Sequence, residues 1–485
     1  MRPNKRPLIY LLLVALLLLV GLLVACSNQG GQTSGGGQGT GASQPTAGAV
    51  AEATAAVSEE SGGTGAVTEV EVTRIVEVPV ESAPSVAVPF YDEWANSPHN
   101  DTEGEPFNHW NEEDPAEVPT DCAKCHSTPG YIDHLGADGS TPGVVDAPAP
   151  IGTTIECTAC HNQVTLTKTS VVFPSGIEIT NLGDEARCME CHQGRASTIS
   201  VDQRIADAGL TEKVDATSED LGFTNIHYYA AAATQFGTLA KGGYEYMGQP
   251  YDARFDHVPT YNTCIECHDM HTLEIKVSEC QACHTDVKTT EDLVNIRMNG
   301  SLVDYDGDGD MKEGIYYEIE GLREKLYGAL QMYSVETTGS MIGFSDTAYP
   351  YFFIDTDMDG TLSEAEAVYP NAFNAWTPRL AKSAYNYVVS KKDPGAYAHG
   401  GKYIIQLLYD SITDLNEAVD APVDLSAANR IDHGHFAGSE EAFRHWDAEG
   451  GIVPGSCAKC HSATGQPEFI TEGVVTSQPA SNGLT

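Results

Sequence analysis

The longest apolar stretch of the chain, residues 8–25, lies close to its first residue and follows Arg2, Lys5 and Arg6. A positively charged segment before an apolar run is typical of an export signal. An uncleaved transmembrane helix is the alternative interpretation, since about 18 apolar residues are enough to span a bilayer. Under either interpretation, the remaining chain is expected outside the cytoplasm.

Residues 26–88 are predicted to form a flexible low-complexity tether. Within them, residues 27–66 consist mainly of Gly, Ser, Thr, Gln and Ala, which cannot bury enough apolar surface to offset the entropy of ordering. Residues 67–81 alternate apolar and charged positions, a pattern that permits a strand or an extended stalk. We expect the folded part to begin near Phe90.

Helical periodicity is clearest late in the chain, over about residues 362–390 and 400–416. Pro370 and Pro378 are expected to break or bend the first of these helices, because proline lacks the backbone N–H that a helix interior needs. The 47 glycines and 25 prolines agree with much irregular structure elsewhere. The sequence therefore predicts a mainly α fold with much irregular loop and little or no β-sheet.

The charge balance excludes some partners. The chain has 26 Lys and Arg against 69 Asp and Glu, a formal net charge of −43 at pH 7. A chain so acidic has no electrostatic footprint for nucleic acid, and it does not bind an anionic lipid surface by charge. Its field would instead steer cationic partners inward and repel small anions.

Thirteen cysteines are present, an odd number that a complete set of disulfides cannot use. Apart from Cys26, all of them form C-x-x-C pairs, and a histidine directly follows each pair. The six motifs are Cys122/Cys125/His126, Cys157/Cys160/His161, Cys188/Cys191/His192, Cys264/Cys267/His268, Cys280/Cys283/His284 and Cys457/Cys460/His461.

C-x-x-C-H is the attachment signature of c-type haem. Two thiols one helical turn apart can form thioethers with the two haem vinyl groups, and the next residue then offers an imidazole nitrogen to the iron. Zinc sites and dithiol redox pairs also use C-x-x-C. With 16 histidines in 485 residues, however, six chance histidines at these positions have odds of roughly one in a billion. The sequence thus predicts six covalently bound haem c groups.

With these motifs the chain resembles the bacterial multihaem c-type cytochromes over most of residues 95–465. Further phrases that carry the resemblance are WANSPH at 94–99, CHDMH at 267–271 and HGGKY at 399–403. The resemblance implies that the haems pack against one another and form the core. It also implies a tightly stacked haem pair at the fourth and fifth motifs.

Ten histidines remain outside the motifs, and bis-histidine ligation of six haems would use six of them. His271 follows the fourth motif in the CHxxH pattern of the family, and from there it would reach a neighbouring haem. For His109, which precedes a tryptophan, a hydrogen bond to a haem propionate is the alternative. His134 and His433 are not expected to be ligands. The distal candidates are His99, His109, His227, His257, His271, His399, His435 and His445.

Two acidic loops are candidate calcium sites. Residues 355–366 (DTDMDGTLSEAE) match the EF-hand loop at each defined position, and hard oxygen donors in this register suit calcium. The expected ligands are Asp355, Asp357, Asp359, Thr361, Ser363 and Glu366. A second loop begins the same way, but Ile315 stands at its twelfth position, so Glu313 is expected to substitute. Its expected ligands are Asp304, Asp306, Asp308, Asp310 and Glu313.

The residues before Cys26, Leu23-Val24-Ala25, resemble the lipobox of bacterial lipoproteins. This resemblance implies cleavage before Cys26 and attachment of lipid to that cysteine. We therefore expect a protein anchored to the outer face of a bacterial membrane, at the cell surface or in the periplasm.

The leading hypothesis is an electron carrier rather than an enzyme, because a bis-histidine haem has no open position for a substrate. Its partners would be other redox proteins, such as a quinol-oxidising membrane complex, another cytochrome or a terminal reductase. One alternative is a multihaem reductase of nitrogen or sulfur oxyanions with a five-coordinate haem. The other is a subunit of an extracellular cytochrome filament.

The predicted organisation has seven segments, in which the last haem region repeats the pattern of residues 99–127. They are a signal peptide (1–25), a tether (26–88), haems one to three (89–200), a haem pair (201–290), a calcium-binding and helical region (291–395), the sixth haem (396–465) and a tail (466–485).

Overall fold

The computed structural model describes residues 87–258, 261–297, 301, 303–432, 451–455, 457–458, 462, 464–474 and 478–479. Two units are distinguished along the chain, Met1–Tyr91 and Asp92–Thr485, and nearly all described residues belong to the second. Among the described helices, none combines the length and the apolar character needed to cross a bilayer. The predictions for Cys26, His433, His435, His445, Cys460 and His461 lie outside the described residues. The seven-segment organisation stays a prediction.

Helices provide most of the regular structure. The α-helices are α2 Tyr91–Ala95, α3 Glu105–Asn108, α4 Thr120–His126, α5 Thr128–His134, α6 Cys157–Cys160, α7 Ala186–His192, α8 Thr198–Asp207, α9 Ala231–Phe236, α10 Cys264–Cys267, α11 Val277–Cys280, α12 Ile315–Thr338, α13 Pro378–Lys392, α14 Ala396–Asn416 and α17 Gly465–Glu472. The 3-10 turns are η1 Pro98–Asn100, η2 Thr165–Thr167, η3 Gly237–Leu239, η4 Thr290–Asn295 and η5 Tyr369–Asn371.

The described strands are short and pair two by two in antiparallel fashion. The pairs are β1 Glu117–Val118 with β2 Ala149–Pro150, β3 Val171–Val172 with β4 Glu178–Ile179, β5 Met341–Phe344 with β6 Phe352–Asp355, and β7 Ile452–Val453 with β8 Gln478–Pro479. In the longest pair, Met341 lies opposite Asp355 and Phe344 opposite Phe352. The prediction of a mainly α fold with little β-sheet is confirmed.

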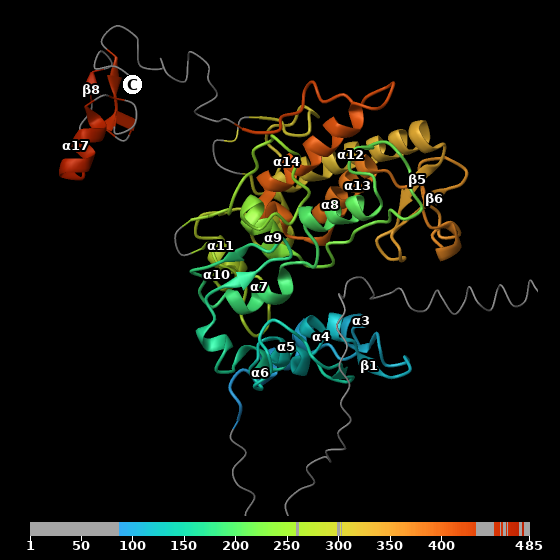
Figure 1. The fold of residues 1–485 in the computed structure, drawn as a ribbon. Helices are drawn as coiled ribbons and strands as arrows, with labels where there is room; N and C mark the ends of the chain where they lie inside the picture. Colours follow the sequence, from blue (N-terminus) through green and yellow to red (C-terminus); the bar gives the residue numbers. More distant parts are fainter. Residues whose placement is uncertain are drawn as a thin grey trace, which may run out of the picture. The chain divides into compact units, whose positions relative to one another are not determined.

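Three long helices, α12, α13 and α14, pack against one another around the largest apolar core of the described residues (Figure 1). Leu322, Leu326 and Leu330 recur every fourth residue along α12 and are fully buried, as are Leu407 and Leu408 of α14. This spacing places the leucines of α12 on one face of the helix. The described part therefore contains an apolar core of protein side chains.

The two predicted long helices differ in outcome. The helix expected over 400–416 is confirmed as α14, which begins slightly earlier. The other exists only from Pro378 onward, and most of residues 362–377 are non-helical. Proline is tolerated at the first helical position, where its missing N–H costs no hydrogen bond. Thr377 caps this start, since its hydroxyl accepts the N–H of Leu380.

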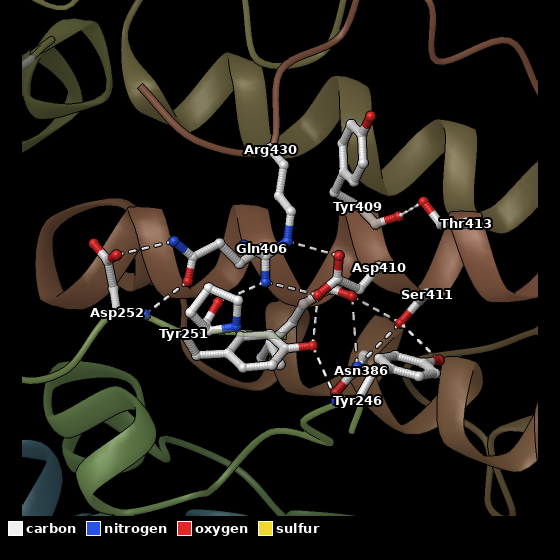
Figure 2. Close-up of polar contacts among 12 residues, drawn as sticks. Tyr246, Tyr251, Asp252, Asn386, Gln406, Tyr409, Asp410, Ser411, Thr413 and Arg430 are labelled. Atoms are coloured by element: carbon white, nitrogen blue, oxygen red, sulfur yellow. Dashed lines mark hydrogen bonds and ion pairs between the residues drawn. The ribbon is translucent and has the colours of Figure 1, made fainter. Parts of the chain in front are cut away.

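A polar network ties the loop before α10 to helix α14 (Figure 2). The hydroxyl of Tyr251 donates to Asp410 at 2.6 Å, and Nε of Arg430 lies 2.7 Å from the same carboxylate. Gln406 accepts the N–H of Asp252 at 2.7 Å and donates to its carboxylate at 2.9 Å. Because buried polar groups are costly when unpaired, this set of bonds holds the loop and the helix in one register.

Candidate functional site

Five of the six C-x-x-C-H motifs lie wholly within the described residues, and each places at least one cysteine on a short helix. Helices α4, α6, α7 and α10 contain both cysteines of a motif, and α11 ends at the first cysteine of the fifth. A spacing of three residues places the two thiols on one helix face. None of the eleven described cysteines forms a disulfide, so these thiols remain available for another bond.

The fifth motif departs from this arrangement at its second cysteine. Because α11 ends at Cys280, Cys283 lies in the turn after the helix, and its side chain is exposed, as is that of Cys157. Helix α11 likewise buries none of its own residues. The N–H of Cys283 still donates to the carbonyl of Cys280 at 3.2 Å, so a tight turn keeps the two cysteines close.

Each motif histidine of these five faces a second histidine from elsewhere in the chain. The ring centres are 5.9 Å apart for His126 and His227, 6.3 Å for His161 and His271, 6.4 Å for His192 and His99, 6.4 Å for His268 and His399, and 6.1 Å for His284 and His257. A metal that binds one nitrogen of each ring at about 2 Å spaces the ring centres by roughly 6 Å. The structure thus brings five of the predicted distal candidates to a ligand's distance from a motif histidine.

The second ring nitrogen of several of these histidines is held by the protein. Nδ1 of His126 lies 2.9 Å from the carbonyl oxygen of Pro106, and Nδ1 of His192 lies 3.0 Å from that of Tyr229. A carbonyl oxygen can only accept, so Nδ1 donates and the lone pair is left on Nε2. Bonds of this kind orient the ring of a metal ligand and raise its basicity.

His399 has the strongest such partner, the carboxylate of Asp393. Both oxygens of Asp393 lie 2.9 Å from Nδ1 of His399, and Asp393 is only 3% exposed. Burial by itself lowers the pKa of His399, but the carboxylate outweighs it and the pKa is raised. Gly395 permits this packing, because a Cβ at that position would lie 2.6 Å from the imidazole. Sequence reasoning missed Asp393, one of many acidic residues in the chain.

Burial keeps other paired histidines neutral. It lowers the pKa of His99 to about 4 and that of His227 to about 3, with smaller contributions from neighbouring cationic groups. A neutral imidazole is the form that binds a metal. Nδ1 of His227 is buried and has no hydrogen-bond partner among the described residues. Its backbone φ of +77° is one that non-glycine residues adopt only where the surroundings hold them there.

Two other histidines do not face a motif histidine. Nδ1 of His109 lies 2.5 Å from the carboxylate of Glu105, one turn earlier, and its ring meets the indole of Trp110 edge-on. Nε2 of His134 lies 3.4 Å from the buried carboxylate of Glu190. The geometry gives neither residue a ligand's position in the described part of the chain.

Thiols of different motifs lie close together. Two pairs of thiols form hydrogen bonds, Cys125 with Cys191 and Cys188 with Cys264. Two further pairs interact at longer range, Cys160 with Cys188 and Cys267 with Cys280. The third motif is therefore next to the first, the second and the fourth, and the fourth is next to the fifth. Spacing along the sequence did not reveal this order.

A buried carboxylate, Glu190, joins the first and third motifs. It lies 2.8 Å from the ammonium of Lys124 on α4 and 2.6 Å from that of Lys168, and it is 5% exposed. Burial by itself raises the pKa of Glu190, but the bonds from His134 and the two lysines outweigh it and the pKa is lowered. This cluster fixes α4 against α7, where the two motifs meet.

The first acidic loop gathers three of its predicted calcium ligands. Carboxylate oxygens of Asp355, Asp357 and Asp359 all lie within 4.8 Å of one another. Glu366 instead accepts the N–H of Thr356 at 2.8 Å and the hydroxyl of Ser363 at 2.8 Å. The loop follows strand β6 rather than a helix, so it is an EF-hand-like loop without the entering helix.

The second acidic loop lies against a buried carboxylate that sequence reasoning missed, Glu318, which also forms an ion pair with Arg297. Asp304, Asp306 and Asp308 converge, and Asp306 also forms a group with Glu313 and Glu318, each within 4.8 Å. Glu318 is fully buried in the first turn of α12. Burial and the neighbouring carboxylates raise the pKa of Glu313 to about 7. A divalent cation would relieve this crowding of like charges.

Comparison with the sequences of known proteins indicates a class of protein that fits this geometry. The chain is 27% identical over 276 residues to the C-type polyheme cytochrome OmcB of Geobacter sulfurreducens strain DL-1/KN400, which is 50% of this chain and 34% of that protein. This likeness supports a multihaem c-type cytochrome. OmcC of strain ATCC 51573 of the same species is 28% identical over 280 residues, 50% of this chain and 32% of OmcC. The chain spans about a third of the length of the curated relatives it matches. No family model and no solved structure matches.

Proposed function

We propose that the protein is an electron carrier with haem c at its C-x-x-C-H motifs and two histidines on each iron. The observation that carries the proposal is the pairing of every described motif histidine with a second histidine at 5.9–6.4 Å. The paired thiols, none of which forms a disulfide among the described residues, and the buried, neutral imidazole of His227 fit the same group. Haem supplies an iron that gains and loses one electron. Two histidine ligands on each iron would leave no position open for a substrate.

The neighbouring thiols support a branched relay. The third motif is the junction, because its two cysteines contact cysteines of the first and fourth motifs. Electrons from the first or second motif would pass the third to reach the fourth and fifth. The protein's part in this transfer is to hold the imidazoles in fixed orientation through Pro106, Tyr229 and Asp393.

The number of six haems, export and the lipid anchor at Cys26 belong to the same proposal and rest on the sequence. A tethered carrier could exchange electrons between a quinol-oxidising membrane complex and another cytochrome or a terminal reductase. Intact-mass measurement of the purified protein tests the count, with six haem additions expected. A Cys26→Ser variant is expected to lose lipid and membrane association.

We also propose that both acidic loops bind calcium and brace the fold. Three converging carboxylates in each loop support this, and so does the crowding around Glu313. The second site would join a loop to the first turn of α12 through Glu318. Extracellular calcium sites of this kind bind at about 10⁻⁴–10⁻³ M, so exported protein would be loaded.

Electron paramagnetic resonance of the oxidised, haem-loaded protein tests the electron-carrier proposal. We expect every haem to be low-spin. A high-spin signal equal to one haem would instead favour a reductase with a five-coordinate iron. His271→Ala is expected to convert one haem to high-spin, because His271 faces His161. His109→Ala is the matched control, since His109 pairs with Glu105 and should leave the spectrum unchanged. A fully low-spin spectrum for His271→Ala would contradict the pairing.

A further inference from the structure

A cavity of about 400 Å³ lies beside the paired histidines, and basic and aromatic side chains line much of it. Its lining includes Tyr228, Tyr229, Arg323, Lys391, Lys392 and Tyr397. The three basic residues of the lining stand against three acidic ones, Glu320, Asp346 and Asp393, so the charges of the cavity balance in a chain whose net charge is −43. The phenol rings of Tyr228 and Tyr229 are exposed, so the cavity is open to solvent at this side.

Two of the three basic residues have partners within the fold. The guanidinium of Arg323 pairs with Glu320 and donates from Nε to the hydroxyl of Ser390 at 3.0 Å. The ammonium of Lys391 lies 5.5 Å from the centre of the Phe344 ring, a cation–π contact. Arg323 therefore has an anionic partner, and Lys391 is only partly buried, so water still reaches its ammonium.

Lys392 is different. It is 4% exposed, and its ammonium lies 3.4 Å from the centre of the Tyr228 ring and 4.6 Å from that of Tyr351. Among the described residues, no carboxylate forms an ion pair with it, although Asp346 lines the same cavity. Burial lowers the pKa of Lys392 to about 8. A buried ammonium without an anion is costly, and an anion beside it removes that cost.

The backbone of Lys392 connects this cation to the histidine pairs. Its carbonyl oxygen accepts the N–H of Tyr229 at 2.6 Å, and the carbonyl of Tyr229 in turn holds Nδ1 of His192 at 3.0 Å. The charge of Lys392 is also one of the causes that lower the pKa of His227. The next residue is Asp393, which holds His399. The backbone at Lys392 is therefore tied to ligand candidates of the third and fourth motifs, and the charge of Lys392 acts on the distal candidate of the first.

We propose that Lys392 is the centre of an anion site that takes a carboxylate or a similar oxyanion. The anion has two possible sources with the same chemistry: a propionate of a haem bound at a neighbouring motif, or a small anion that enters the cavity from solvent. In either case Lys392 neutralises the anion and positions it next to the histidine pairs. This inference rests on the proposed haem binding and deepens it.

The test uses the full-length, haem-loaded protein and compares Lys392→Gln with Lys382→Gln. Lys382 lies on the same helix, α13, and its ammonium is 5.0 Å from the centre of the Tyr244 ring, away from the residues that line the cavity. Midpoint potentials are measured with and without inorganic phosphate at constant ionic strength. Infrared difference spectra between the reduced and oxidised protein detect carboxylates that respond to the charge of a haem. Paramagnetic resonance checks separately that all haems stay low-spin.

Without phosphate, Lys392→Gln is expected to lower the potential of one haem relative to the wild type, and Lys382→Gln is not. A tenfold change in the oxidised-to-reduced ratio corresponds to about 59 mV for one electron. If the anion is a propionate, the variant also shifts a carboxylate band, and phosphate changes nothing. If the anion comes from solvent, phosphate lowers the wild-type potential to that of the variant, which no longer responds.

Lys392→Arg keeps the charge and is expected to restore the wild-type potential. The phosphate titration of the wild type needs no variant and detects an anion that comes from solvent. If Lys392→Gln fails to fold, Lys392→Met is the second neutral variant, and its carboxylate band tests for a propionate. The proposal is overturned if neither the carboxylate band nor the phosphate response depends on Lys392. A high-spin signal in the wild type would instead count against the bis-histidine ligation and leave the anion site standing.

Discussion

Replacement of Asp393 by Asn tests the claim that His399 is an iron ligand tuned by a buried carboxylate. Both carboxylate oxygens face Nδ1 of His399 at 2.9 Å. Asparagine keeps the size of the side chain and an oxygen that can accept the same hydrogen bond, but it removes the charge. A negative charge on the far side of a ligand stabilises the oxidised iron more than the reduced iron. The potential of the fourth haem should therefore rise in Asp393→Asn.

The size of the rise follows from the distance between the carboxylate and the iron position. The path includes the 2.9 Å hydrogen bond, the imidazole ring and the metal–nitrogen bond, the last two at about 2 Å each, so it totals about 7 Å. With an effective dielectric constant of about 20, Coulomb's law gives about 2.4 kcal/mol. That energy is nearly two tenfold steps in the redox equilibrium, or about 100 mV for one electron.

A redox titration followed by visible absorbance measures this shift in the haem-loaded protein. The matched control is Asp424→Asn, because Asp424 is exposed and its carboxylate accepts local hydrogen bonds from Ser426. We expect one haem to move upward in Asp393→Asn and none in the control. A potential that stayed constant or fell while the spectrum remained low-spin would refute the assignment of His399 as a ligand.

Two further predictions concern stability. Glu190→Gln leaves Lys124 and Lys168 without their shared carboxylate, and we expect the free energy of unfolding in urea at pH 7 to drop by about 3 kcal/mol. Because the pKa of Glu190 is lowered in the fold, its contribution to stability is complete above the ordinary carboxyl pKa and is lost as the pH falls through the lowered value. The free energies of unfolding of the wild type and Glu190→Gln should therefore converge in acid. A difference that stays constant with pH would contradict this. Chelation of calcium should lower the thermal unfolding temperature, and calcium at a hundredfold excess over Kd should restore about 2.7 kcal/mol for each of the two sites. Glu318→Gln should weaken that recovery, whereas Glu324→Gln, at an exposed position of α12, should not; equal recovery in both would contradict a role for Glu318.

The long helices show where periodicity succeeds and where it fails. Helix α14 was predictable because its apolar residues recur at helical spacing around Tyr403 and Leu407, and both are buried. Helix α12 was not among the helices predicted from the pattern, although it is longer. Gly321 and Gly328 interrupt it, and glycine is a poor helix former. Its packing against α13 and α14 outweighs that preference, and packing between distant segments is absent from a local pattern.

The same division holds for the site. Haem attachment is a local device, so Cys122, Cys125 and His126 could be recognised from a few successive positions of the chain. The exposure of Cys283 could not be predicted in this way, because it depends on which segments of the fold pack around the fifth motif. The choice of His227 as the partner of His126 likewise depends on a loop that reaches α4 only in the folded chain.

Counting histidines narrowed the distal candidates without deciding among them. His227 and His109 are both distal candidates in the sequence, with a hydrogen bond to a haem propionate as the alternative for His109. Only the fold separates them, because His109 pairs with Glu105 of its own helical neighbourhood and His227 meets His126 across the chain.

Buried charges are the part of the site that no sequence pattern indicated. Asp393, Glu190 and Glu318 are ordinary members of a set of 69 acidic residues until the fold buries each of them next to a partner. Lys392 is the reverse case, since the fold buries it and places no carboxylate of the described residues at ion-pair distance, although the charge of Asp346 acts on it from across the cavity. A buried charge must be matched, because desolvation is costly. Asp393, Glu190 and Glu318 therefore mark places where the chain meets a histidine or a cation, and Lys392 marks a place where an added anion would be stabilised.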